Sequence, residues 1–282
     1  MAQFPAWAEL SITPVSSAGT DNALYRLGAD MAVRLPRIPS AAGQVEMDHR
    51  WLPRLAPLLP LPIPVPRALG QPGAGFPWRW GVYPWLPGQD ATAAPIADLG
   101  LAARDLAAFI AALRHIEPTG GPPPREGNAF RGVPLADRDA AVRAALAALH
   151  GSLETATAAA AWEASLRAPV WQNPPVWLHG DLQPLNLLVQ QGRLSAVIDF
   201  GCLGVGDPAC DLIVAWQLLN AESRAVLRAA LADDDATWVR GRGWALSIGL
   251  LAMPYYRTTN PTLAAIGQRA ITEAIEDYLG GA

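Results

Sequence analysis

Residues 176–212 read VWLHGDLQPLNLLVQQGRLSAVIDFGCLGVGDPACDL, and this stretch decides the fold. An apolar run at 176–178 leads directly into His179 and Asp181, so a buried segment ends in an acidic side chain. Two further apolar runs, at 187–189 and 194–198, flank a glycine-containing turn. This pattern predicts a β-hairpin.

The predicted hairpin brings oxygen-bearing side chains together. If its two-residue loop is Gly192-Arg193, antiparallel pairing places Asn186 opposite Asp199, whereas a loop of Gln191-Gly192 shifts the pairing by two residues. In either register an amide oxygen and a carboxylate lie at the same open end, with Asp181 just upstream. Such a cluster suits Mg²⁺, which takes one or two protein oxygens and completes its octahedron with water and phosphate oxygens. Asp181 then stays free to orient a substrate hydroxyl and accept its proton, as phosphoryl transfer requires.

Three motifs occur in a fixed order here: HGDLQPLN at 179–186, IDFG at 198–201 and GDPACDL at 206–212. Together they resemble the aminoglycoside phosphotransferase family, whose members are related to protein kinases. The resemblance implies the following roles: Asp181 as catalytic base, His179 as a brace of the catalytic loop, Asn186 and Asp199 as metal ligands, and Asp207 and Asp211 as supports of the loop that border the substrate pocket. Asp207 also precedes a proline, so capping of a helix is an alternative role that needs no substrate.

Composition limits the class of protein. With 282 residues, 51% of them hydrophobic and 16% charged, the chain can bury a substantial core. The net charge of −4 and the lack of a basic stripe argue against a nucleic-acid partner, while a small cationic substrate is compatible. No apolar run has the length of a membrane span, and the N-terminus lacks a secretion signal, so we expect a cytoplasmic enzyme that does not bind membranes. Cys202 and Cys210 are predicted to be small buried residues.

The chain contains no lysine: all 21 basic residues are arginine. Kinase-like sites usually bind the nucleotide phosphates through a strand lysine that pairs with a helical acid. Arg34, in the predicted strand 31–37, is our candidate for this role, with Arg37 as the alternative. The amphipathic stretch 44–59 resembles the acid-bearing helix, and the sequence leaves open whether Glu46 or Asp48 supplies the acid. We favour Asp48, because relatives place their glutamate at this position and a longer arginine compensates for a shorter acid.

Two further segments of the N-terminal part resemble nucleotide-binding elements. The polar loop 16–22, with Gly19 as its one glycine, is similar to the flap over the phosphates. The aromatic strand that ends in the closely spaced breakers at 84–88 is similar to a kinase hinge, where backbone groups around Tyr83 to Trp85 would bind the base. The proline-dense run 57–66 is predicted to be extended and to cross the back of the small lobe.

The rest of the chain is predominantly helical in pattern from Asp98 onward. Between two amphipathic stripes, the Gly- and Pro-rich stretch 118–134 is predicted to be an irregular loop that could border the substrate cleft. Acids and aromatic residues in the later helices, including the aspartate run 233–235, resemble the region with which relatives bind amino groups. Such a run is also typical of an exposed loop or a helix cap.

The sequence therefore predicts an α+β, two-lobed, protein-kinase-like fold, with a nucleotide-binding lobe at 1–84 and a catalytic and substrate-binding lobe at 85–282. The predicted reaction transfers the γ-phosphoryl group of ATP or GTP, with Mg²⁺, to a hydroxyl of a small molecule. An aminoglycoside-type antibiotic is the leading acceptor. A kinase for a macrolide or a metabolite alcohol and an inactive binding protein of the same fold are the alternatives. The nucleotide, the hydroxyl and the choice between monomer and homodimer stay open.

Overall fold

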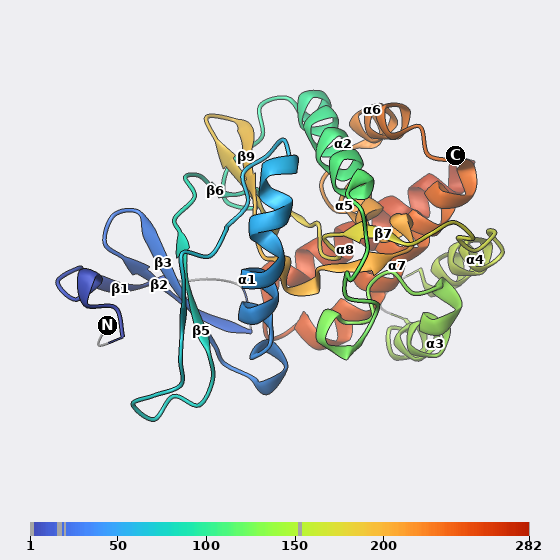
Figure 1. Cartoon of the computed structure of the whole chain (residues 1–282). Helices are drawn as coiled ribbons and strands as arrows, with labels where there is room; N and C mark the ends of the chain where they lie inside the picture. Colours follow the sequence, from blue (N-terminus) through green and yellow to red (C-terminus); the bar gives the residue numbers. More distant parts are fainter. Residues whose placement is uncertain (1–2, 16–18, 20, 152–153, 282) are drawn as a thin grey trace.

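The computed structural model describes residues 3–281 except 16–18, 20 and 152–153. Its N-terminal part forms an antiparallel sheet of five strands in the order β1-β2-β3-β5-β4. The elements are β1 (Ile12–Val15), β2 (Asn22–Leu27), β3 (Met31–Pro36), α1 (Gln44–Leu55), β4 (Ala68–Gly70) and β5 (Trp80–Pro84). In Figure 1 this sheet lies on one side of the molecule, the helices of the C-terminal part lie on the other, and α1 runs between them.

The helix α1 belongs to both parts of the molecule. The sheet has a small core of its own around Leu27 and Val82. The apolar face of α1, by contrast, packs into the large core of the C-terminal part, where the rings of Trp51 and Trp177 lie 4.7 Å apart. Asp48 lies on the same buried side of α1 as Leu52 and Leu55, and from there its carboxylate lies 3.4 Å from Arg34 of β3.

The C-terminal part contains most of the helices. In chain order its elements are β6 (Gln89–Asp90), α2 (Leu99–His115), α3 (Asp139–Ala148), α4 (Thr155–Leu166), β7 (Val176–Leu178), β8 (Leu187–Gln190), β9 (Arg193–Val197), β10 (Gly204–Gly206), α5 (Val214–Gln217), α6 (Ala221–Leu231), α7 (Asp235–Tyr256) and α8 (Pro261–Leu279). The long helices α7 and α8 pack against each other at the centre of this part (Figure 1). The predicted α+β, two-lobed architecture is confirmed, whereas the boundary at residue 84 stays a prediction.

The hairpin of β8 and β9 has the second of the two predicted loops. Gln191 and Gly192 form the turn, with φ of +52° and +76°, as a tight hairpin turn requires. Next to the turn, Val189 pairs with Leu194. An irregularity between Leu188 and Val189 then shifts the pairs toward the open end by one residue, so that Leu188 pairs with Ala196. The register that places Asn186 opposite Asp199 is therefore wrong: the Asn186 carbonyl accepts the N–H of Ile198 at 2.9 Å. Both side chains still lie at the open end of the hairpin.

The segment at 57–66 differs from expectation in its position. Its first residues continue α1 as a short 3₁₀ turn, Ala56–Leu58, and the rest is extended as predicted. It does not cross the back of the sheet, because Pro62 accepts the N–H of Val197 at 3.0 Å and Ile63 lies in the large core. The prolines thus run along β9, where a missing N–H is tolerated at a sheet edge.

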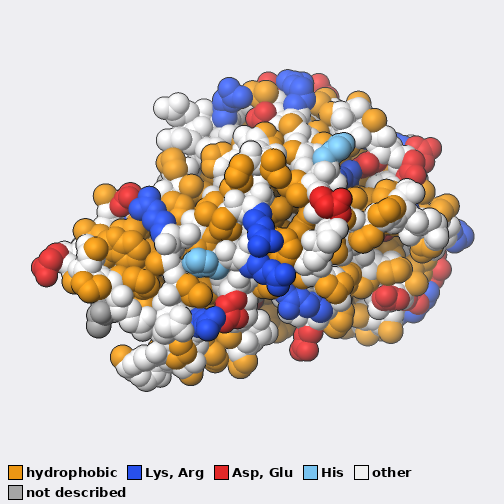
Figure 2. Space-filling model, viewed as in Figure 1, with side chains coloured by type: hydrophobic (Ala, Val, Ile, Leu, Met, Phe, Trp, Pro, Cys, Tyr) orange, Lys and Arg blue, Asp and Glu red, His pale blue; other side chains and the backbone are white. Residues whose placement is uncertain are grey.

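The surface is mixed in character. On the face shown in Figure 2, hydrophobic side chains alternate with polar ones, and basic side chains gather in one short row near the middle. Within the described residues, no helix is both long and apolar enough to span a bilayer.

Candidate active site

The loop that carries His179, Gly180 and Asp181, the predicted catalytic loop, is held by one buried carboxylate. Asp211 accepts the backbone N–H groups of His179 at 2.8 Å and Gly180 at 2.7 Å, and only 1% of its surface is exposed. Burial raises the pKa of Asp211, although the two backbone N–H bonds oppose that rise. Gly180 adopts φ of +80°, and a Cβ here would lie 2.4 Å from the carbonyl oxygen of Cys202. The loop therefore requires both the glycine and the acid, and the predicted support role of Asp211 agrees with these contacts. Its predicted place at the border of the substrate pocket needs correction, because the carboxylate is buried and both oxygens accept backbone N–H groups.

The ring of His179 joins the catalytic loop to the strand that precedes Asp199. Its Nε2 lies 3.0 Å from the Ile198 carbonyl, and its Nδ1 accepts the N–H of Asp181 at 3.2 Å. These contacts require the proton on Nε2. The ring is fully buried and lies 4.6 Å from that of Phe200. His179 thus braces the loop as predicted and is not placed to take part in proton transfer.

Asp181 is held from three directions. Its carboxylate accepts the side-chain N–H groups of Gln183 at 2.7 Å, Asn186 at 3.0 Å and Arg131 at 3.2 Å. Asn186 also donates to the Asp181 backbone carbonyl at 2.8 Å. The side chain of Asp181 remains 23% exposed. A fixed, partly accessible carboxylate is what a general base needs, because its oxygen must reach a hydroxyl without reorganising.

Asp199 occupies a position of backbone strain. It has φ of +60°, in the left-handed region, and its side chain is about half exposed. Its carboxylate accepts Nη2 of Arg34 at 2.7 Å. Desolvation alone would raise the pKa of Asp199, but the charge and the hydrogen bond of Arg34 lower it below the usual value. The carboxylate is therefore ionised at neutral pH.

Asn186 and Asp199 form a donor set that fits Mg²⁺. The amide nitrogen of Asn186 is bonded to Asp181, so its oxygen is the atom that can face a cation. The described residues contain no group of three or more His, Cys, Asp or Glu side chains that could hold a metal by themselves. Magnesium sites in phosphoryl transfer use one or two protein oxygens together with phosphate oxygens and water, so two protein donors are sufficient.

Arg34 and Asp48 form the predicted pair. Nη1 of Arg34 lies 3.4 Å from the Asp48 carboxylate, and Nη2 also donates to Gln44 at 3.1 Å. Glu46 lies elsewhere and pairs with Arg79 at 3.0 Å. Because α1 places Asp48 on its buried side, desolvation raises the pKa of Asp48 to about 6, although Arg34 opposes the rise. The geometry thus selects Asp48 from the two acids that the sequence left open.

The proposed hinge has a different contact pattern from the one expected. The Tyr83 hydroxyl is buried and donates to Asp48 at 2.8 Å, and burial together with Asp48 raises the pKa of Tyr83 well above its usual value. The backbone N–H of Trp85 donates to the backbone carbonyl of Asp30 at 2.8 Å. The expectation that Trp85 offers this N–H to a base therefore needs correction, since the group is already bonded. Base binding by the other backbone groups of this segment stays a prediction.

The predicted flap, residues 16–22, lies only partly within the described residues. Of the predicted loop 16–22, residues 16–18 and 20 lie outside the described part of the chain, and Gly19 is exposed between them. Its contact with phosphates stays a prediction.

Asp207 acts inside the fold. Its carboxylate accepts Nε of Arg240 at 2.7 Å, Nη2 of the same side chain at 3.2 Å and the N–H of Ala209 at 3.0 Å. Asp207 is 5% exposed and Arg240 3% exposed. This corrects the prediction that Asp207 contacts the substrate, because its carboxylate is buried and both oxygens are occupied by a guanidinium that is itself buried and by a backbone N–H. The alternative role, a cap before Pro208, is the one observed.

The aspartate run 233–235 also serves the fold. Asp234 caps α7 by accepting the N–H of Thr237 at 2.6 Å, Asp233 pairs with Arg114, and Asp235 pairs with Arg228. The cap alternative is therefore the one observed for Asp234, while Asp233 and Asp235 make ion pairs within the fold.

Arg131 is the main site residue that sequence reasoning missed. It comes from the Gly- and Pro-rich loop that was predicted to border the substrate cleft, but no motif marks it there. Its side chain lines a pocket of about 360 Å³ together with residues from the C-terminal half of α7.

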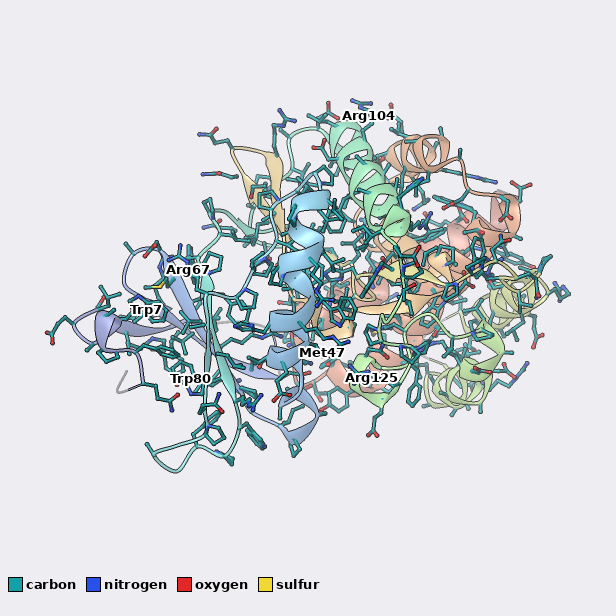
Figure 3. The ribbon with its side chains drawn as sticks, in the orientation of Figure 1. Trp7, Met47, Arg67, Trp80, Arg104 and Arg125 are labelled. Carbon is teal, nitrogen blue, oxygen red and sulfur yellow. The ribbon has the colours of Figure 1, made fainter. Side chains whose placement is uncertain are left out.

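A smaller pocket of about 40 Å³ lies beside α1, where Met47 and Arg125 face each other (Figure 3).

The structure combines an antiparallel sheet with a mainly helical part. Its His-Gly-Asp loop is followed by a hairpin that carries Asn186 and Asp199 at its open end. These features define a kinase-like phosphotransferase fold. The model of the phosphotransferase enzyme family (APH) matches residues 11–244. This chain therefore belongs to that family.

Individual relatives agree with this assignment. An aminoglycoside 3'-phosphotransferase of Escherichia coli is 36% identical over 84 residues, a match that spans 28% of this chain and 31% of that protein. A GDP and kanamycin complex of APH(2")-IIia has a TM-score of 0.72 at 19% identity, with 98% of this chain and 97% of that chain covered. The macrolide 2'-phosphotransferase MphH of Brachybacterium faecium has a TM-score of 0.62 at 23% identity, with 96% and 95% covered. The two solved structures share the fold with this chain.

Proposed function

We propose that this protein transfers the γ-phosphoryl group of a nucleoside triphosphate to a hydroxyl of a small molecule. The observation that carries the proposal is the position of Asp181. Three side-chain donors fix its carboxylate beside Asn186, at the open end of the hairpin that also carries Asp199.

In this proposal Asp181 accepts the proton of the acceptor hydroxyl. The hydrogen bonds from Asn186 and Gln183 hold one carboxylate oxygen, and Arg131 holds the other, so the group keeps one orientation. A base that is fixed before the substrate binds raises the rate through positioning, which supplies much of the catalysis in phosphoryl transfer.

Asn186 and Asp199 would hold Mg²⁺, which when bound neutralises charge on the nucleotide phosphates. Arg34 would contact those phosphates in place of the usual lysine. Its guanidinium already lies between the helical acid Asp48 and Asp199, and it offers further N–H groups in a planar fork. Arginine thus replaces lysine in position and charge.

The names of the relatives supply candidates for the acceptor and the nucleotide. They include an aminoglycoside 3'-phosphotransferase, a GDP and kanamycin complex, a streptomycin–ATP complex and macrolide 2'-phosphotransferases. Kinship therefore makes an aminoglycoside-type antibiotic the first acceptor to test, with either ATP or GTP. The pocket beside Arg131 favours a second class, an alcohol with an apolar body, because Ile248, Leu251 and two tyrosines form its wall. We place the enzyme in the cytoplasm, where the nucleotides are available, as a monomer or homodimer.

The test is a phosphorylation assay with purified protein. ATP and GTP are each supplied with Mg²⁺ and with kanamycin, streptomycin, a macrolide or a simple alcohol, and the phosphate monoester is detected by mass spectrometry. We expect a phosphorylated product whose formation depends on Mg²⁺. We also expect the nucleotide and the acceptor to raise the apparent melting temperature of the protein when they bind. Absence of both nucleotide binding and product with every acceptor would contradict the proposal and favour an inactive binding protein.

A further inference from the structure

The pocket beside the catalytic carboxylate has an unusual charge. It has a volume of about 360 Å³, which is in the range for small-molecule sites, and its wall includes Ile248, Leu251, Tyr255 and Tyr256. Its polar side includes the guanidinium groups of Arg131 and Arg138, and none of its lining residues is acidic. Arg131 donates to Asp181 at 3.2 Å, so one side chain of the pocket wall contacts the proposed base. The inference below rests on the proposed function.

Arg138 is half-buried, and it differs in its partners from other buried or half-buried arginines. Arg240, Arg114 and Arg224 each have a carboxylate within 3 Å. Arg138 has no ion pair among the described residues. Its Nε donates to the hydroxyl of Ser247 at 2.6 Å, and its guanidinium lies 4.6 Å from the centre of the Trp244 ring.

The environment of Arg138 disfavours its charge. Burial, with a further contribution from the nearby positive charge of Arg131, lowers the pKa of Arg138 to about 10. The side chain remains protonated at neutral pH, so the pocket holds a positive charge that the protein does not neutralise. A partly buried charge without a partner is unfavourable, and a ligand of opposite charge would relieve it.

This charge distinguishes between classes of acceptor. A polycation that enters the pocket would meet Arg131 and Arg138, and the resulting repulsion would oppose its binding. A carboxylate, by contrast, matches the fork of a guanidinium in shape and in charge. The apolar wall of α7 and the two tyrosines would then contact the body of the molecule.

We propose that the acceptor is an alcohol with an apolar body and a carboxylate group, which Arg138 binds while the hydroxyl lies at Asp181. In the reaction the hydroxyl oxygen forms a bond to the γ-phosphorus, and the bond from that phosphorus to the β–γ bridging oxygen breaks. The hydroxyl proton passes to Asp181. The products are a nucleoside diphosphate and a phosphate monoester that keeps its carboxylate.

The test uses probes that differ only in the group at one end. They are ω-hydroxydecanoic acid, decanediol and aminodecanol, with the corresponding hexane series for a shorter reach. Binding is measured by calorimetry in the presence of a non-hydrolysable Mg²⁺–nucleotide, and phosphorylation is measured by mass spectrometry. We expect an acid of one series to bind roughly tenfold or more tightly than its diol, the change that one charge-assisted hydrogen bond gives, and the amine to bind most weakly.

Two pairs of variants assign the preference to the pocket. Arg138→Gln is expected to remove the preference for the acid, whereas Arg138→Lys keeps most of it.

Ala129 is an exposed residue of the pocket wall with φ of +52°, a conformation that Asp and Asn accept more readily than Ala. Ala129→Asp adds a carboxylate and is expected to weaken binding of the acid, while its neutral match Ala129→Asn leaves that binding unchanged. The Ala129 pair keeps the test valid if Arg138→Gln fails to fold.

The outcomes separate this inference from the proposed function. Equal binding of acid, diol and amine, tighter binding of the amine, no binding of the acid, or a preference that is the same in Ala129→Asp and Ala129→Asn overturns the inference. If kanamycin is phosphorylated in these cases, the phosphotransferase function still stands. Absence of Mg²⁺-dependent nucleotide binding in the unmodified protein would instead contradict the proposed phosphotransferase function.

Discussion

Asp181→Asn is expected to lower kcat for phosphoryl transfer by about 10²- to 10⁴-fold, the usual contribution of a positioned general base. Asparagine has nearly the same shape and can still accept hydrogen bonds, but it cannot take the proton of the acceptor hydroxyl. KM for the nucleotide should change little, because Asn186 keeps its 2.8 Å hydrogen bond to the backbone carbonyl of residue 181, which leaves its amide oxygen free for a cation. Steady-state kinetics together with a separate measurement of nucleotide affinity tests this expectation.

A matched control is available on the surface. Asp235 pairs with Arg228 but its side chain is 92% exposed, so Asp235→Asn should leave both kcat and stability close to those of the wild type. A kcat for Asp181→Asn within a few fold of the wild type would exclude Asp181 as the base. The role would then have to pass to another group near the hairpin.

Asp207→Ala is expected to destabilise the protein by about 3–5 kcal/mol, because it leaves the buried guanidinium of Arg240 without its carboxylate. The pair is almost fully enclosed, with Nε and the carboxylate oxygen 2.7 Å apart. Denaturant unfolding measures the change in the free energy of unfolding. The exposed pair Arg228–Asp235 serves as control, and Asp235→Ala should cost less than about 1 kcal/mol.

This prediction also separates the two roles considered for Asp207. A structural role predicts lower stability with KM for the acceptor unchanged in the protein that remains folded. Unchanged stability combined with a large rise in acceptor KM would return Asp207 to the substrate pocket.

The core of the site could be predicted from sequence because its chemistry is contiguous. His179, Asp181, Asn186 and Asp199 all lie within 21 residues, and the hairpin between them follows from the alternation of apolar runs and a glycine turn. The exact register could not be predicted. Gln191 and Gly192 both adopt positive φ, and the irregularity after Leu188 then shifts the pairs beyond it, which no local pattern indicates.

Residues brought in from distant segments were harder to predict. Arg131 lies in an irregular loop, where neither periodicity nor a motif marks a side chain that reaches Asp181. The choice of Asp48 over Glu46 depended on which side of α1 is buried, and both acids fit the sequence pattern almost equally well. Arg34 could be predicted, because the absence of lysine left few basic candidates on the predicted strand.

The structural acids show the opposite limit. Asp207 and Asp211 occur in one motif, and the resemblance gave them a shared role. Only the partners distinguish them: Asp211 accepts two N–H groups of the catalytic loop, whereas Asp207 pairs with Arg240, 33 residues later on α7. A motif thus identifies which acids matter, and long-range packing determines what each one does.

The central claim is that Asn186 and Asp199 hold a metal ion that the nucleotide shares, beside Asp181. The most direct test is electron paramagnetic resonance of Mn²⁺, in place of Mg²⁺, titrated into the protein with and without a non-hydrolysable nucleotide. We predict that the nucleotide strengthens Mn²⁺ binding to the wild type and to Asp181→Asn, and that Asp199→Asn loses this coupling. Equal coupling in Asp199→Asn and the wild type would contradict the account.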